Sequence, residues 1–128
     1  FMPLVNAALS GHAKRLPGEL ARLNTLSLNP VGVALAFERR AAQLAQLSAR
    51  MRPGEDVGSF VESQKRARRI FFKDERDIAE QLRIWRGKRL DRLVSRLTAL
   101  HQALLANSQQ AELLLAQEIA WIARAASR

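Results

Sequence analysis

The chain has 128 residues, with 21 Lys and Arg against 12 Asp and Glu, a formal net charge of +9 and a pI of about 11.5. It contains no cysteine, which excludes a disulfide framework and a thiolate metal site and fits a reducing, cytoplasmic location. No apolar run approaches the roughly 18 residues of a membrane span, so no membrane contact is expected. The basic excess predicts either a partner rich in phosphate or carboxylate, or a solvated basic surface.

The hydrophobic pattern predicts helices throughout, because no stretch alternates with a period of two and β-branched residues are few. Three helices are expected in the first half of the chain. They are a short helix over 3–10 that stops at Gly11, a second from Pro17 to about Ser27, and a long third that begins at Asn29-Pro30 and closes at Pro53-Gly54.

The second half predicts three or four further helices. Asp56 is the expected cap of a short helix over 57–64, and Asp74 the cap of a helix that ends near Trp85. Gly87 predicts a break or a bend. An amphipathic helix follows, with Leu90, Leu93, Val94, Leu97, Leu100 and Leu104 on its apolar face, and a last helix is expected over 109–126.

These elements predict a compact all-α bundle of six or seven helices, with residues 1–128 forming a single domain. The connecting loops are short, so sequential helices are expected to pack as antiparallel neighbours.

The residues capable of chemistry do not form a recognisable reactive group. His12 and His101 are far apart, and the metal-binding, phosphate-loop and dinucleotide-binding motifs are absent. The acidic pairs that begin at Glu55 and Asp74 lie at expected helix starts, where carboxylates stabilise free N–H groups. The sequence therefore predicts no catalytic residue, no cofactor and no metal.

The charge is concentrated between Lys65 and Arg96, where twelve basic residues meet five acidic ones. If helix continues through Gly87, one face carries the candidate nucleic-acid residues Trp85, Arg89, Arg92 and Arg96. An aromatic ring beside guanidinium groups suits single-stranded nucleic acid, since bases stack and phosphates pair. The alternative is that Trp85 joins Ile78 and Leu82 in the core while the arginines face water.

Two groups of apolar residues, one on the last helix and one at Phe71 and Phe72, could belong either to the core or to a surface that contacts a partner. The last helix is apolar around much of its circumference, which makes Leu115, Ile119 and Ile122 a candidate subunit interface. Trp121 lies on the same helix and is expected in the core or at an interface. Phe71 and Phe72 are interpreted as anchors for the segment before the next helix, with partner docking as the alternative.

Three stretches of the chain together resemble one protein family. They are PLVNAALSGHAKRLPGELARLNTLSLNPVGVALAFERRAAQLAQL, IFFKDERDIAEQLRIW and LDRLVSRLTALHQALLANSQQAELLLAQEIAWIA. They are similar to the C-terminal third of the delta subunits of the bacterial DNA polymerase III clamp loader, above all in the alphaproteobacterial branch. The most specific part is Phe71-Phe72-Lys73 followed by Trp85. The family usually has prolines where this chain has Arg68-Arg69, and commonly a Lys where it has Leu105.

The resemblance implies a non-enzymatic assembly role in DNA replication. In that family the C-terminal helical domain oligomerises with the loader ATPase subunits and delta prime into a circular collar, so that the sliding clamp can be loaded onto primed DNA. Primer–template DNA is a further partner that the collar position implies. Contact with the sliding clamp belongs to the family's first domain, which these residues do not include. The alternative function is a stand-alone basic helical protein that binds nucleic acid through 65–96.

Overall fold

The computed structural model describes residues 1–26 and 29–128, and over these residues it is an all-α bundle of seven helices without a strand. The helices are α1 (Met2–Leu9), α2 (Leu16–Thr25), α3 (Pro30–Arg50), α4 (Val57–Arg66), α5 (Glu75–Ile84), α6 (Lys88–Ala106) and α7 (Ala111–Ala126). Two single 3₁₀ turns, η1 (Phe72–Asp74) and η2 (Ser108–Gln110), precede α5 and α7. The predicted fold class is confirmed, whereas the predicted end of the second helix at Ser27 lies outside the described residues.

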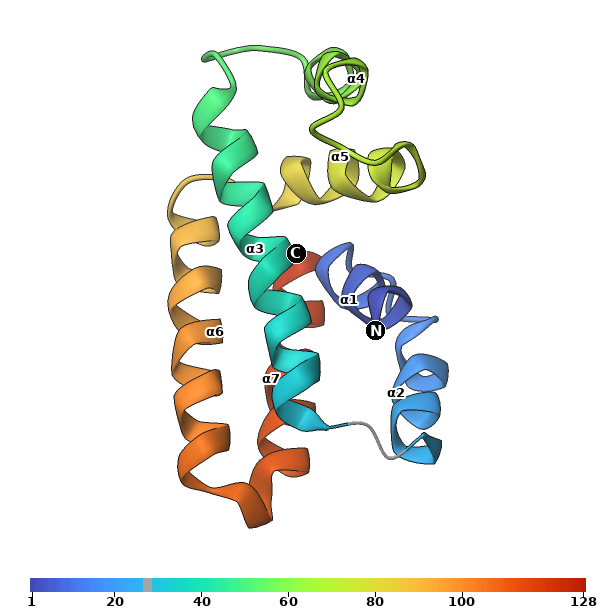
Figure 1. Ribbon diagram of the computed structural model, residues 1–128, viewed down its shortest axis with the longest axis vertical. Helices are drawn as coiled ribbons and strands as arrows, with labels where there is room; N and C mark the ends of the chain where they lie inside the picture. Colours follow the sequence, from blue (N-terminus) through green and yellow to red (C-terminus); the bar gives the residue numbers. More distant parts are fainter. Residues whose placement is uncertain (27–28) are drawn as a thin grey trace.

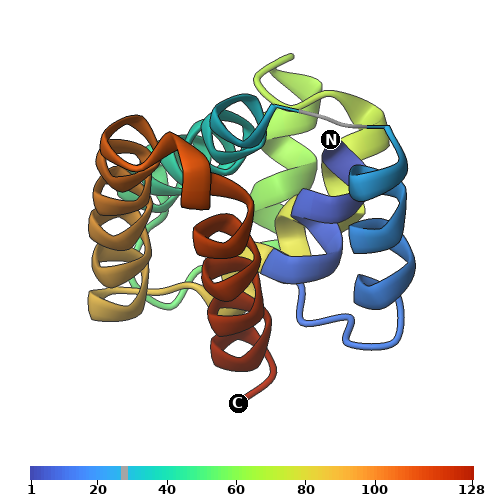
Figure 2. The same cartoon turned by 90° about the horizontal axis from the view of Figure 1, so that it is seen from below.

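The three longest helices form the body of the bundle. Figure 1 shows α3, α6 and α7 along the long axis of the molecule, with α4 and α5 at one end and α1 and α2 to one side. Figure 2, seen along that axis, shows α1 between α7 and α2. Helices α6 and α7 pack as the expected antiparallel pair. The main neighbour of α3, however, is α6, which is distant in sequence, and α1 packs on α7.

Local sequence signals explain where α3 and α4 begin. The side chain of Asn29 accepts a hydrogen bond from the Val31 N–H (2.9 Å), and that of Asp56 accepts one from the Ser59 N–H (2.9 Å). The bonds to Ser59 lower the pKa of Asp56, because they favour its charged form. Asp74 precedes α5 but makes no capping bond through its side chain, so that prediction is wrong.

Buried apolar residues from all helices except α2 join in one core cluster. In α3, Val33, Phe37, Leu44 and Leu47 are buried, and in α6 every residue of the predicted stripe is buried except Val94, which is 37% exposed. Gly11, after α1, lies against the end of α7, where an added Cβ would come within 3.2 Å of the Ala126 carbonyl carbon. Its φ of +70° adds a second reason for glycine there.

Candidate interaction surfaces

Trp85, the aromatic member of the candidate nucleic-acid face, lies in the core. The helix does not continue through Gly87. Helix α5 ends at Ile84, and α6 begins at Lys88, directly after Gly87, whose φ is +54°. Trp85 is 1% exposed, and its Nε1 donates a hydrogen bond to the Leu9 carbonyl oxygen (2.8 Å). No base can stack on a ring enclosed in this way. The nucleic-acid role of Trp85 is therefore corrected to the alternative, a core residue.

Two of the three candidate arginines on α6 are bonded within the chain. Arg89 donates a hydrogen bond to the carbonyl oxygen of Ala125, and its guanidinium carbon lies 5.4 Å from the centre of the Trp85 ring. It thus satisfies one of the carbonyl groups that the last turn of α7 leaves without a helical partner. Arg89 therefore links α6 to the last turn of α7.

Arg96 forms the second internal connection. It donates two hydrogen bonds to the Glu118 carboxylate, at 2.7 and 3.0 Å, and stacks on Trp121 with 3.7 Å from guanidinium carbon to ring centre. A bidentate ion pair on an aromatic ring fixes the α6–α7 register. Arg92 is exposed and has no ion pair or side-chain hydrogen bond among the residues that the structure describes.

A cleft of about 310 Å³ lies at this join. Its lining consists of Trp85, Arg89, Arg92, Trp121, Ala125 and Arg128. Three guanidinium groups and no acidic side chain line it, which gives the cleft a positive potential suited to an anion. Trp121, which is partly buried, takes the place beside the arginines that the sequence assigned to Trp85. Only α6–α7 packing brings Trp121 there, so no local signal could have shown it.

The candidate subunit interface on the last helix is part of the core. Leu115, Ile119 and Ile122 are 2%, 1% and 1% exposed. They are enclosed because α1, α3 and α6 all pack on α7. The assignment of these three residues to a partner surface is therefore corrected, since a folded chain does not present them. The exposed apolar side chains of this region are Leu113 on α7, 60% exposed, and Leu105 on α6, 66% exposed.

Phe71 and Phe72 do not anchor their segment. They are 58% and 64% exposed, while the neighbouring Ile70 is 2% exposed and supplies the anchor instead. The two rings contact each other, with centres 4.9 Å apart and planes inclined by 62°. The anchoring interpretation is wrong, and the pair is a surface-exposed aromatic knob.

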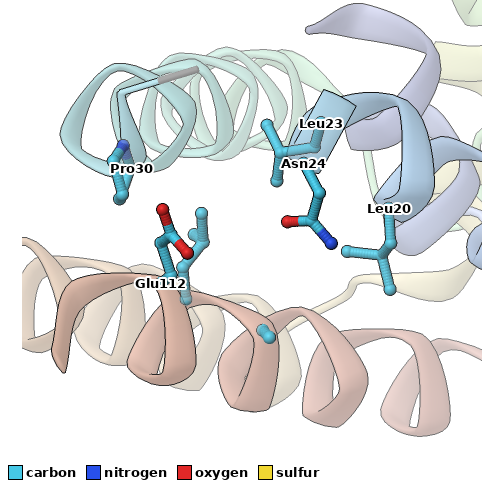
Figure 3. A pocket seen from close by; sticks show the side chains of 7 residues that line it. Leu20, Leu23, Asn24, Pro30 and Glu112 are labelled. Carbon is cyan, nitrogen blue, oxygen red and sulfur yellow. The ribbon is translucent and has the colours of Figure 1, made fainter. Parts of the chain in front are cut away.

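A groove of about 330 Å³ separates α2 from α7. Figure 3 shows Leu20, Leu23 and Asn24 of α2 on one side and Glu112 of α7 on the other, with Pro30 near one end. Helix α2 has no fully buried residue, so its contact with the bundle is the least extensive of the seven. No local pattern in the sequence predicts this groove, because it depends on how α2 lies beside α7.

A polar cluster crosses the core between α1, α3 and α5. Arg40, 4% exposed, donates hydrogen bonds to Asn6 Oδ1 (2.8 Å) and Gln81 Oε1 (3.0 Å), and Gln81 Nε2 donates to Asn6 Oδ1 (2.9 Å) and Ser10 Oγ (3.1 Å). Burial lowers the pKa of Arg40, and the nearby Asp74 opposes the change. Because its members satisfy one another, the cluster specifies how these helices meet.

The two histidines occupy boundary positions. His12 pairs with Glu80 at 2.7 Å, between the α1–α2 turn and α5. His101 pairs with Glu38 at 2.7 Å, between α6 and α3. In the ranges 1–26 and 29–128 no three His, Asp or Glu side chains gather as metal ligands would. The first pair joins the α1–α2 turn to α5, and the second joins α6 to α3.

Comparison with known proteins finds no matching family model, no matching curated protein and no matching solved structure. Across the described parts of the chain, every helix falls short of the length or hydropathy that crossing a membrane requires.

Proposed function

We propose that this chain is an assembly module of a bacterial replication clamp loader, corresponding to the C-terminal collar domain of a delta-type subunit. It oligomerises with the loader ATPase subunits and delta prime in the bacterial cytoplasm, and so takes part in loading the sliding clamp onto primed DNA. The module catalyses no reaction itself. Clamp contact belongs to another domain of such subunits.

The observation that carries this proposal is the exposure of Phe71 and Phe72, which belong to the most specific motif of the family resemblance. Phe71 and Phe72 are more than half exposed, although phenylalanine is usually buried. The core is complete without them, because Ile70 fills the adjacent core position. Large aromatic side chains that folding does not need are typical centres of protein–protein interfaces.

Light scattering behind size exclusion tests the proposal directly. The chain is run alone and mixed with the loader ATPase subunits and delta prime of the same organism. We expect a mixed complex that withstands moderate salt and buries more than about 1,000 Å². A chain that is well folded by circular dichroism and yet forms no complex would refute the proposal.

A second candidate function is favoured by the arginine-lined cleft beside Trp121. We propose that Arg92 and Arg128 bind the phosphates of single-stranded nucleic acid there. Arg89 is unsuited to a test of this proposal, since reversing its charge would remove its bond to Ala125. Arg92→Glu leaves every internal bond in place, and Arg124→Glu, exposed on α7, is a control with the same charge change.

The assay is fluorescence anisotropy of a labelled single-stranded oligonucleotide over a range of salt concentrations. Loss of one phosphate contact should lower the slope of log affinity against log salt by about 0.7 for Arg92→Glu. The control should change the affinity less. An affinity that does not depend on salt would contradict this second function.

A further inference from the structure

The stretch from Arg66 to Lys73 presents its aromatic and basic side chains to solvent. We call the exposed set Arg66, Arg68, Arg69, Phe71, Phe72 and Lys73 the 66–73 surface. It lies between α4 and α5, at the end of the molecule seen at the top of Figure 1. This surface includes the exposed phenylalanines on which the proposed function rests.

The backbone holds this surface in a defined shape. After α4 the Arg69 N–H bonds to the Gln64 carbonyl oxygen (2.9 Å) and the Arg68 N–H to that of Lys65 (3.0 Å), which places Arg68 at a φ of +61°. Ile70 is then buried, and the Asp74 N–H bonds to the Phe71 carbonyl oxygen (2.9 Å). Such preorganisation reduces the entropy lost when a partner binds.

The aromatic pair has the shape of a knob rather than of a stacking platform. The two rings meet edge to face, and the Lys73 Nζ lies 5.9 Å from the centre of the Phe72 ring. Stacking on nucleic-acid bases requires an open ring face. The edge-to-face contact covers one ring face and joins the two side chains into a compact exposed knob, a shape suited to filling a concave apolar pocket.

The cations around the knob have few carboxylate partners. Arg68 and Lys73 form no ion pair within the described residues, and Arg66, 74% exposed, reaches only Glu62 at 3.6 Å. Lys65 differs, because it is held by Glu62 (3.2 Å) and Glu75 (3.0 Å). The knob is therefore flanked in the sequence by three exposed cations, Arg68, Arg69 and Lys73, that form no ion pair within the described residues.

We propose that the 66–73 surface docks on a protein partner, inserting Phe71 and Phe72 into an apolar pocket whose rim carries Asp and Glu. The complementary charges follow from the unpaired cations, and an aromatic centre with a charged rim is the usual organisation of an interface. The inference rests on the proposed function, and it names the chemistry of the surface through which this chain meets a loader subunit.

The experiment compares three double variants of the chain by the Kd of the complex with the loader ATPase subunits and delta prime. One is Phe71→Ser with Phe72→Ser, and another is Arg68→Glu with Lys73→Glu. The matched control is Lys14→Glu with Arg15→Glu, which changes the charge equally at two exposed residues between α1 and α2. Circular-dichroism melts establish that each variant is folded.

We expect each pair of substitutions in the 66–73 surface to weaken the complex about tenfold or more, and the control to change it much less. Raising the ionic strength from about 0.15 to about 1 M should abolish the effect of the charge variant, because screening shortens from about 8 to about 3 Å. The effect of the phenylalanine variant should persist at high salt.

The contrary outcomes separate the inference from the proposed function. A complex that both surface variants retain, and that Leu105→Ser with Leu113→Ser abolishes, would overturn the docking site and leave the assembly role intact. If the charge variant loses only single-stranded DNA binding while the complex survives, the surface binds nucleic acid and the inference fails. A wild-type chain that is folded and forms no complex refutes both.

Discussion

Replacing Ile119 with alanine tests whether the apolar face of α7 belongs to the core of this chain. Ile119 is 1% exposed, and the substitution removes three buried carbons. At about 0.8 kcal/mol for each buried CH₂ the transfer loss is about 2.4 kcal/mol, and the residual cavity raises the expected cost to about 3–4 kcal/mol. For a chain of this length that corresponds to a fall in Tm of about 12–16 °C.

Urea unfolding and a thermal melt, both followed by circular dichroism, measure this cost. Leu113→Ala on the same helix is the matched control, because Leu113 is 60% exposed and its truncation should change stability by about 0.5 kcal/mol or less. If Ile119→Ala melted within a few degrees of the wild type and instead weakened the complex with the loader subunits, α7 would present this face to a partner. The core placement would then be refuted.

Three further predictions concern single positions. Gly11→Ala should cost about 2 kcal/mol in urea unfolding, because a side chain at positive φ is strained and its Cβ would press on the end of α7. Arg68→Gly should raise the Tm by a few degrees, since φ is +61° there. Asp56→Ala should lower the Tm at pH 7 and lower it less at pH 3. The pKa of Asp56 is depressed, so its stabilising effect is complete above about pH 3.9 and is lost as the pH falls through the lower folded value. Equal effects at the two pH values would contradict that assignment.

The helices could be predicted because their signals are local. Asn29 and Asp56 cap through bonds to N–H groups two and three residues away, so the sequence contains both partners. The predicted interruption of the helix near Gly87 is found between α5 and α6, and Gly87 has a positive φ. Asp74 is also an aspartate at the N-cap position of a helix, as Asp56 is, but its side chain makes no capping bond. Its carboxylate lies 3.9 Å from the buried Arg40 on α3, a neighbour that no local pattern identifies.

The candidate sites could not be predicted as well, because each depends on contacts between distant segments. Leu115, Ile119 and Ile122 become core residues through the packing of α1, α3 and α6 on α7. Trp85 is enclosed with its Nε1 bonded to Leu9, which lies 76 residues earlier. The hydrophobic pattern identifies an apolar face correctly, but it does not tell whether the same chain or another one covers that face.

Whether a group contacts the same chain or another one also decides which basic side chains are free to bind a partner. On α6 the guanidinium groups of Arg89 and Arg96 bond to groups of α7, so they are already engaged within the chain. In the 66–73 surface, Arg68 and Lys73 form no ion pair within the described part of the chain, and in the sequence they flank two exposed aromatic rings. Burying those rings against a partner would also lower the dielectric constant around the cations, which strengthens their attraction to its carboxylates. Affinity from the knob and specificity from the charges would therefore arise in one binding step, and the two contributions should separate by their salt dependence alone.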